Sequence, residues 1–409
     1  MKLALQHLTA VLHHQLNITG SKSESNRLLV LQALFPQLEV VNLSNADDVK
    51  AMLSALGSTD PLKDIHHAGT TMRFLTAYYA TSEGQTVSIT GSQRMQERPI
   101  GILVEALRQL GASLSYEKKE GYPPLRIEGK KIETTEVQLP ASVSSQYISA
   151  LMLVAPRLEK GLEIVLEGTI TSVPYIKMTQ ALLERVGIKT QFEGNRIQIA
   201  TFQGKMDAQT LVVESDWSSA SYFYSMVALA SEAKIELTSY RKDSLQGDAV
   251  LQDLYRELGV STHFTEKGIV LEKITNFTPP EKVAFDLVNA PDLAQTIAVS
   301  CAGLGVGCDL TGLHTLKIKE TDRLVALEKE LTKLGAVICV TEDSLHLESG
   351  AELKSQIAIA TYQDHRMALA FAPLALKVPI IIEEAMVVTK SYPDYWRDLE
   401  ALGFHLDKK

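Results

Sequence analysis

A helical pattern that ends on glycine recurs six times along the chain and limits what it can fold into. In each copy, apolar residues three or four positions apart mark one buried helix face, and the glycine takes the left-handed conformation that ends a helix. After four copies the residues alternate as a half-buried strand does, at 112–116, 188–192, 260–264 and 336–340. The glycines are 54 to 76 residues apart, which predicts six folding units of similar size. They are Gly57, Gly111, Gly187, Gly259, Gly335 and Gly403.

The six units divide most simply into two sets of three. The widest stretch without a motif of its own spans residues 230–242, so we expect a domain boundary near Tyr240. A chain of 409 residues is long enough for two or three domains whose cores need no disulfides. Helices that alternate with short strands indicate the α/β fold class.

Composition excludes several classes of function. Lys and Arg number 40 against 49 Asp and Glu, a net charge of −9, so the chain lacks the broad basic surface of a nucleic-acid-binding protein. The cysteines Cys301, Cys308 and Cys339 form no CxxC pair, and we expect no zinc site and a reducing compartment. The longest apolar run, residues 367–376, is too short to span a membrane. We therefore expect a cytoplasmic protein with no membrane or nucleic-acid partner.

Cationic residues gather beside Gly, Ser and Thr at six apparent helix starts. Free backbone N–H groups, hydroxyls and a fixed cation together make an anion site, and the helix dipole adds to it. A single segment of this kind usually holds only a solvated side chain, so only the whole set indicates a function. The segments are Gly20–Arg27, Ala68–Arg73, Arg94–Gly101, Lys317–Arg323, Tyr362–Arg366 and Thr389–Pro393.

Local patterns within and beside these segments leave several roles open. Gly20–Arg27 lacks the spacing of a nucleotide phosphate loop, which disfavours a nucleotide triphosphatase. Lys319 and Arg323 are four residues apart and share a face if their segment is helical, although an exposed charged turn is commoner. Ser144–Gln146 precedes an apolar helix, and Asp292 stands in a first helix turn. Capping is the usual role of such residues.

Taken together, these segments resemble the 5-enolpyruvylshikimate-3-phosphate synthase family of enolpyruvyl transferases over nearly the full length of the chain. The segments that carry the resemblance keep the family's order: Gly20–Arg27, Ala68–Arg73, Arg94–Gly101, Val143–Gln146, Ser218–Phe223, Lys319–Arg323, Asp364–Met367 and Tyr392–Tyr395.

The resemblance implies an α/β (α+β) fold of two similar domains. Each domain would contain three βαβαββ units arranged as an inside-out α/β barrel, with the active site in the interdomain cleft. The implied domains are residues 20–239 and residues 1–19 with 240–409. The family also implies a monomer.

The reaction implied by the resemblance joins shikimate 3-phosphate to phosphoenolpyruvate and releases phosphate, without a metal or cofactor. The 5-hydroxyl of shikimate 3-phosphate adds to C2 of the enolpyruvyl group while C3 is protonated, and the tetrahedral adduct then loses a proton and phosphate. Bringing two polyanions together costs Coulomb energy unless cations surround both, and the basic segments would supply those cations.

Matching the family's motifs position by position implies the site residues. Proton transfer falls to Asp292, as acceptor from the 5-hydroxyl, and to Glu320, assisted by Lys22 or Lys390. The residues implied for phosphoenolpyruvate are Lys22, Gly69, Arg98, Gln146, Arg323, Arg366 and Lys390. Those implied for shikimate 3-phosphate are Lys22, Ser23, Arg27, Ser144, Ser145, Gln146, Ser172, Asp292 and Lys319.

Three positions depart from the family's pattern. His67 stands where Asn usually precedes Ala-Gly, Phe74 where Pro usually follows Arg, and Thr315 where Asn usually contacts shikimate 3-phosphate. The first departure lies beside the phosphoenolpyruvate site and predicts altered binding of phosphoenolpyruvate and of the inhibitor glyphosate. A histidine that merely replaces the amide in a hydrogen bond is an equally good interpretation.

Two alternative functions stay open at this point. A UDP-N-acetylglucosamine enolpyruvyl transferase shares the fold and the donor, but that family generally carries Cys or Asp on a mobile loop of the first domain. All three cysteines here lie beyond residue 300, which favours the shikimate enzyme. The second alternative is a non-catalytic anion-binding protein that has kept the architecture.

Overall fold

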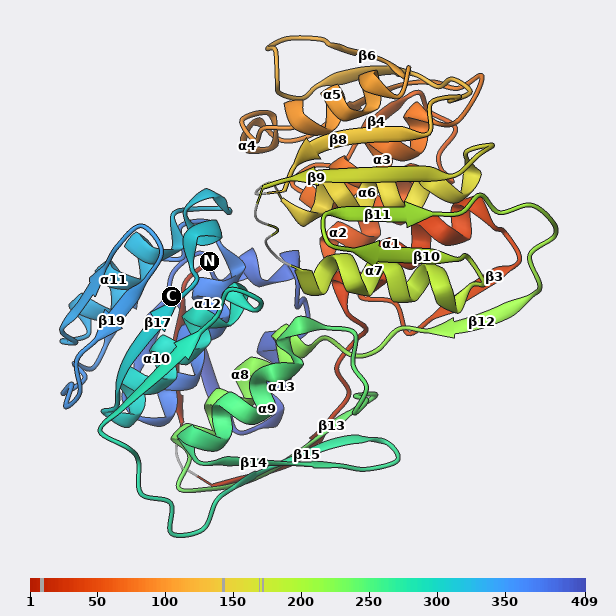
Figure 1. The fold of residues 1–409 in the computed structure, drawn as a ribbon. Coiled ribbons are helices and arrows are strands. Elements are labelled where there is room, and N and C mark those ends of the chain that lie inside the picture. Colours follow the sequence, from red (N-terminus) through yellow and green to blue (C-terminus); the bar gives the residue numbers. More distant parts are fainter. Residues whose placement is uncertain (8–10, 142–143, 169, 171–172) are drawn as a thin grey trace. The chain divides into compact units, whose positions relative to one another are not determined.

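The computed structural model describes residues 1–7, 11–141, 144–168, 170 and 173–409 (Figure 1). The described chain divides into two compact units. The terminal unit consists of Met1–Thr19 and Glu214–Lys409, and the central unit consists of Gly20–Val213. None of the helices in the described ranges has the length and apolar character that a membrane span requires.

The second division falls earlier in the chain than the expected boundary near residue 240. Strand β2 (Val11–Leu16) pairs in parallel with β13 (Glu232–Thr238) along its whole length. Helix α8 (Trp217–Leu229) packs against β13 as well. Residues 214–239 therefore fold with the amino-terminal strand. The stretch without a sequence motif is a strand inside the terminal unit, and the division lies after Val213.

Two sheets of the central unit share one topology. Their first two strands are parallel and joined through a helix, and their last two strands form an antiparallel hairpin that returns beside the second strand. This is the βαβαββ unit that the resemblance implies. One sheet has the order β4 (Leu62–Asp64), β5 (Thr86–Thr90), β7 (Leu125–Glu128), β6 (Ser113–Tyr116), and the other has the order β8 (Glu136–Pro140), β9 (Leu162–Glu167), β11 (Arg196–Ile199), β10 (Thr190–Glu193).

The terminal unit repeats this strand order in three sheets, two of which borrow a strand from the amino terminus. In the first, β2 supplies the leading strand. In the third, β1 (Leu3–His7) completes the hairpin with the last strand of the chain. The orders are β2, β13, β15 (Gly268–Lys273), β14 (Val260–Phe264); β16 (Lys282–Asp286), β17 (Gly307–Thr311), β19 (Leu345–Leu347), β18 (Ile338–Val340); and β20 (Ile357–Ile359), β21 (Ile380–Ile382), β1, β22 (Phe404–Lys408).

A sixth sheet keeps only the parallel pair β3 (Leu38–Val41) and β12 (Gln209–Val212). Helix α2 (Asp47–Gly57) follows β3 and leads directly to β4, without a hairpin between them. The α/β fold class is thus confirmed, and within the described chain five βαβαββ units are complete and one lacks its hairpin.

Each of the two compact units is built around three buried helices. In the central unit these are α1 (Lys22–Leu34), α3 (Gly69–Ala80) and α6 (Ser145–Val154), which pack against one another; Figure 1 shows α3 and α6 side by side. Every residue of α3 except Tyr78 is buried, and every residue of α6 except Gln146. Small and apolar residues on all faces allow this, because a helix enclosed on every side can expose no charged stripe.

The terminal unit uses α8, α10 (Ala294–Leu304) and α12 (His365–Phe371) in the same way. The remaining longer helices bury one face and expose the other, as α5 does by burying Leu103, Val104, Ala106 and Leu107. These amphipathic helices are α2, α5 (Gly101–Gln109), α7 (Val173–Arg185), α11 (Arg323–Lys333) and α13 (Tyr395–Ala401).

Five of the six glycines behave as the repeat predicts. Gly111, Gly187, Gly259, Gly335 and Gly403 have φ between +82° and +101°, and a strand follows each one. The expectation for Gly57 was wrong. It is the last residue of α2, its φ is not positive, and Ser58 continues in an extended conformation, because this truncated unit has no hairpin to reverse into.

Alanine at Gly57 and at Gly111 should therefore change stability in opposite directions. No atom lies within 4 Å of a Cβ added at either site, so the backbone alone decides. We expect Gly57→Ala to raise the free energy of unfolding by about 0.5–1 kcal/mol, and Gly111→Ala to lower it by about 1–2 kcal/mol. Chemical denaturation of both variants measures this, and a shift of the same sign in the two would contradict the difference in their helix ends.

Candidate functional site at the starts of the buried helices

The implied site residues stand mainly in the first turns of the buried helices. Lys22 opens α1, Gly69 opens α3 and Ser145 opens α6. In the terminal unit Asp292 lies in the 3-10 turn before α10, and Arg366 is the second residue of α12. Helix starts offer free N–H groups and the positive end of the dipole, so each unit collects anion-binding positions at one end of its core.

In the central unit two guanidinium groups flank Gly69. A Cβ at this position would lie 2.7 Å from Nη1 of Arg98 and 2.9 Å from Nη1 of Arg73, so glycine is what lets both approach. Arg73 donates to the carbonyl oxygens of Gly69 at 2.8 Å and Pro99 at 3.4 Å. Burial and then the charge of Arg98 lower the pKa of Arg73 to about 10. Two like charges held at a helix start favour an anion between them.

Gln146 contacts the residue that follows Gly69. Its Nε2 donates to Oγ1 of Thr70 at 3.4 Å, which joins the start of α6 to the start of α3. Ser144 is exposed and caps α6 by accepting from the Gln146 backbone N–H at 3.4 Å. The Tyr147 hydroxyl donates to the Pro99 carbonyl oxygen at 2.7 Å. The starts of α3 and α6 therefore meet the segment that carries Arg98.

The Arg27 guanidinium group is hydrogen-bonded to other groups of the central unit. Its side chain is buried and donates to Thr179 Oγ1 at 2.8 Å, to Ser149 Oγ at 2.9 Å and to the Ser23 carbonyl oxygen at 2.9 Å. Burial lowers the pKa of Arg27 to about 10. Its contact with shikimate 3-phosphate stays a prediction and would require it to exchange one of these partners. Ser172, implied for the same substrate, lies outside the described residues.

In the terminal unit three cations surround Asp292. Nη1 of Arg323 lies 2.8 Å from its Oδ1, Nη2 of Arg366 lies 3.2 Å from its Oδ2, and Nζ of Lys319 lies 3.6 Å from its Oδ1. Burial alone would raise the pKa of Asp292, but the charges of Arg366, Lys319 and Arg323 outweigh it and hold that pKa far below its ordinary value. The carboxylate is therefore ionised at neutral pH.

Arg323 joins this cluster to two further carboxylates. It is almost fully buried, and it donates to Asp364 at 2.6 Å and to Glu320 at 2.9 Å. Burial opposes its charge, but Asp364, Glu320 and Asp292 together raise its pKa above the ordinary value. Asp364 also caps α12 by accepting from the Arg366 backbone N–H at 2.8 Å. Asp364 lies inside one of the motif segments, although the sequence assigned it no role.

A buried carboxyl group that the sequence did not single out adjoins the same cluster. Nη2 of Arg366 donates to Ser218 Oγ at 3.3 Å, and Ser218 in turn donates to Oδ2 of Asp248. Burial raises the pKa of Asp248 to about 6, although the charge of Arg366 opposes the rise. Asp248 follows only Gln-Gly, a pair with no spacing signal, which is why sequence reasoning missed it.

The expectation that Lys319 and Arg323 share a helix face was wrong. Lys319 and Glu320 lie between the 3-10 helix η5 (His314–Ile318) and α11. Asp322 caps α11 by accepting from the backbone N–H groups of the second and third helix residues at 3.2 Å, and so fixes the first helical residue as Arg323. In the irregular stretch before the cap, Lys319 still approaches Asp292 to 3.6 Å.

The expectation of a helix start at Lys390 was also wrong. Lys390 is the last residue of the 3-10 helix η7 (Ala385–Lys390), and its Nζ donates to the Gln363 carbonyl oxygen at 2.8 Å. Gln363 comes directly before the Asp364 cap of α12. This bond ties Lys390 to the segment that carries Arg366.

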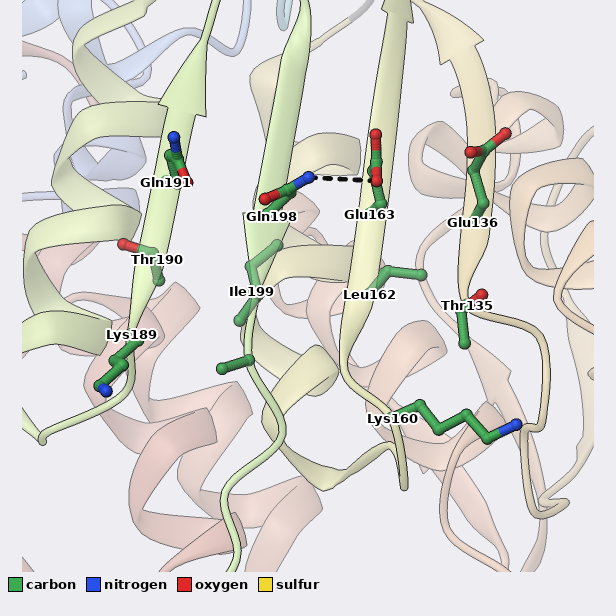
Figure 2. Close-up of a pocket in the computed structure, with 11 residues that line it drawn as sticks. Thr135, Glu136, Lys160, Leu162, Glu163, Lys189, Thr190, Gln191, Gln198 and Ile199 are labelled. Atoms are coloured by element: carbon green, nitrogen blue, oxygen red, sulfur yellow. Dashed lines mark hydrogen bonds between the residues drawn. The ribbon is translucent and has the colours of Figure 1, made fainter.

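A surface pocket of about 410 Å³ in the central unit is separate from these residues (Figure 2). It lies along the β8–β11 sheet, where Gln198 donates to Glu163 at 3.2 Å, and Lys160 and Lys189 stand on opposite sides of it. None of the implied site residues lines it. Among the described residues, no cluster of three His, Cys, Asp or Glu side chains is placed to hold a metal ion.

Comparison with known proteins decides the family. Residues 57–399 match the family model described as EPSP synthase (3-phosphoshikimate 1-carboxyvinyltransferase). The chain belongs to the EPSP synthase family. It is 46% identical over 393 residues to a 3-phosphoshikimate 1-carboxyvinyltransferase of Bacteroides fragilis, covering 95% of both chains. It is 35% identical to the enzyme of that name from Histophilus somni, covering 98% of this chain and 99% of the relative.

Solved structures support the fold of this EPSP synthase family member. An EPSP synthase from Acinetobacter baumannii superposes with a TM-score of 0.78 at 20% identity over 100% of both chains. The enolpyruvyl transferase NikO from Streptomyces tendae gives a TM-score of 0.74 at 13% identity, over 99% of this chain and 98% of its own. At these identities the likeness shows the two-domain α/β fold alone.

The raised pKa of Asp248 predicts a pH-dependent cost to stability. A carboxyl group whose folded pKa is about 6 against an ordinary 3.8 holds its proton more tightly when folded. The stability from this proton is present below about pH 4 and is lost as the pH rises through 6. Asp248→Asn keeps an oxygen that accepts from Ser218 but cannot ionise. We expect the variant to gain about 2–2.5 kcal/mol relative to wild type between pH 4 and pH 7.

Denaturant unfolding at pH 4, 5, 6 and 7 measures this gain. Ser218→Ala serves as a control, because it removes the hydrogen bond and leaves the carboxyl group in place. A stability difference between Asp248→Asn and wild type that stays constant over this range would contradict the assigned shift.

Proposed function

We propose that this protein transfers the enolpyruvyl group of phosphoenolpyruvate to the 5-hydroxyl of shikimate 3-phosphate and releases phosphate. The observation that carries the proposal is the ionised Asp292 carboxylate held among Arg323, Arg366 and Lys319, in a chain of the EPSP synthase family. A hydroxyl needs a base before it can attack, and a departing phosphate needs cations. The terminal unit supplies both.

Substrate binding is proposed to activate Asp292. The charges of Arg366, Lys319 and Arg323 stabilise the Asp292 carboxylate so strongly that it is a weak base. A substrate phosphate or carboxylate that binds Arg366 and Arg323 forms ion pairs with their guanidinium groups, which then stabilise the Asp292 carboxylate less. The pKa of Asp292 then rises, because the carboxyl group stays buried while its stabilisation by the neighbouring cations weakens. The carboxylate becomes able to accept the proton of the 5-hydroxyl.

The other proton transfer takes place at C3 of the enolpyruvyl group. Glu320 is proposed for it, since it is paired with Arg323 at 2.9 Å and is only partly buried. Lys22 and Lys390 are proposed to assist, as the resemblance implies. An acid able to protonate C3 and recover the proton during elimination satisfies both halves of the addition–elimination reaction.

Several of the proposed anion contacts lie at helix starts, and the others lie in segments beside them. The residues proposed to hold phosphoenolpyruvate are Lys22, Gly69, Arg98, Gln146, Arg323, Arg366 and Lys390. Arg suits bidentate contact with a phosphate or carboxylate, and Lys supplies a compact charge. Shikimate 3-phosphate is assigned to Lys22, Ser23, Arg27, Ser144, Ser145, Gln146, Ser172, Asp292 and Lys319. We also propose that the protein acts as a monomer in the cytoplasm.

A phosphate-release assay tests the function directly. Wild-type protein should release phosphate only when phosphoenolpyruvate and shikimate 3-phosphate are both present. Asp292→Asn removes the base and should lower kcat by about 10²–10⁴-fold. Lys22→Ala should raise KM for both substrates because it removes a cation shared by their sites. Release from phosphoenolpyruvate alone, or wild-type turnover in Asp292→Asn, would contradict the proposal.

His67 precedes α3 and forms a pair with its neighbour. Nδ1 of His66 lies 2.7 Å from Nδ1 of His67, so one ring donates and the other accepts. Nε2 of His67 lies 3.6 Å from Asp47 Oδ2. The imidazole thus links His66 and Asp47 just before the helix that begins with Gly69.

Replacement of His67 by the family's usual residue tests whether this pair shapes the phosphoenolpyruvate site. We expect His67→Asn to change KM for phosphoenolpyruvate and the inhibition constant for glyphosate, because His67 lies two residues before Gly69, the first residue of α3. His13→Asn serves as a control, since His13 is an exposed strand residue of the terminal unit. Unchanged constants for both ligands in His67→Asn would refute the expectation.

A further inference from the structure

The segment between β20 and α12 has a strained backbone. Tyr362 has φ +53° and Gln363 has φ +57°, so two successive residues that carry side chains lie in the left-handed region. Residues other than glycine rarely adopt this region, and they keep it only where surrounding contacts enforce it. We call residues 360–364 the strained turn.

Helix α11 holds both ends of the strained turn. Near its carboxyl end the fully buried Glu330 accepts from the Tyr362 hydroxyl at 2.6 Å and from the Ala360 backbone N–H at 3.1 Å. At its amino end Arg323 donates to Asp364 at 2.6 Å. These two helix positions are about 10 Å apart along the axis. The turn is therefore fastened along the side of α11 at two separate points.

The 3-10 helix η7 holds the strained turn from the other direction. Thr361 Oγ1 donates to Glu384 Oε2 at 3.3 Å, where η7 begins, and Lys390 donates to the Gln363 carbonyl oxygen at 2.8 Å, where η7 ends. Arg366 follows the turn directly. The position of this one segment thus fixes the spacing of three cations on three elements, Arg323, Arg366 and Lys390.

We propose that Glu330 and Tyr362 are positioning residues for phosphoenolpyruvate. Their hydrogen bond keeps the turn left-handed, which aims the Gln363 carbonyl oxygen at Lys390 and the Asp364 carboxylate at Arg323. Neither residue is among those assigned to a substrate. This inference rests on the proposed function, because the three cations are assigned to phosphoenolpyruvate there.

The buried carboxylate of Glu330 suits this role. Lys333 lies 2.7 Å from it and neutralises its charge from the half-exposed side of α11. The Tyr362 hydroxyl is partly buried, and burial followed by the hydrogen bond and charge of Glu330 raises its pKa above the ordinary value. The hydroxyl therefore stays protonated and donates to Glu330 at every pH at which the enzyme would work.

The test removes only the Tyr362 hydroxyl. We expect Tyr362→Phe to raise KM for phosphoenolpyruvate roughly tenfold, because the turn would no longer hold Arg323, Arg366 and Lys390 at their present spacing. KM for shikimate 3-phosphate should change less than about twofold, and kcat less than about threefold. Tyr362→Phe/Gln363→Asn should recover most of the loss, because Asn adopts the left-handed conformation more readily than Gln.

Tyr224→Phe is the matched control. Tyr224 lies in the same unit, and its hydroxyl is hydrogen-bonded to Thr262 Oγ1 at 2.7 Å, away from the strained turn. It should lower stability without changing either KM. If Tyr362→Phe fails to unfold cooperatively, Glu330→Gln replaces it, and the same rise in KM for phosphoenolpyruvate is expected.

The outcomes separate this inference from the proposed function. If wild-type protein releases no phosphate from the two substrates together, the proposed function fails and the positioning role fails with it. If wild type is active but Tyr362→Phe has the constants of Tyr224→Phe, only the positioning role is overturned. Absence of recovery in the double variant also overturns it, because the effect would not then pass through the turn.

Discussion

The buried ion pair between Arg323 and Asp364 is the interaction on which the terminal site depends. It joins the start of α11 to the start of α12, and it leaves the other nitrogens of Arg323 to Asp292 and Glu320. A buried charge without partners costs several kcal/mol, whereas the buried Arg323 is paired with three carboxylates of the chain itself. These side chains therefore hold one another in place, and under the proposed function a substrate anion would compete with them.

The repeated βαβαββ topology explains why the charges collect in one place within each unit. In each compact unit the three inner helices pack against one another, and a hydrogen bond joins the starts of two of them. Gln146 with Thr70 makes this contact in the central unit, and Arg366 with Ser218 makes it in the terminal unit. The shared topology thus brings helix starts together in both compact units. The units differ in the side chains that stand at those helix starts.

Sequence reasoning found what local chemistry determines. Five glycine helix ends and the helices that open at Lys22, Gly69 and Ser145 could be predicted, because capping and periodicity act over a few residues. Sequence reasoning failed where contacts between distant segments determine the structure. The unit of Gly57 has no hairpin, and residues 214–239 join the terminal unit through pairing of β13 with the distant β2. Asp248 was missed because only burial beside Ser218 makes it unusual.

The pKa values of Arg73 in the central unit and Arg323 in the terminal unit shift in opposite directions. In the central unit burial and the neighbouring Arg98 lower the pKa of Arg73, whose donors go to carbonyl oxygens. In the terminal unit carboxylates raise the pKa of Arg323 despite its burial. Under the proposed function, an anion that binds would therefore relieve a repulsion in the first case and displace a partner in the second. The first arrangement would capture an anion, and the second would couple capture to the release of Asp292 as a base, which is the order that attack by a hydroxyl on a bound enolpyruvyl group requires.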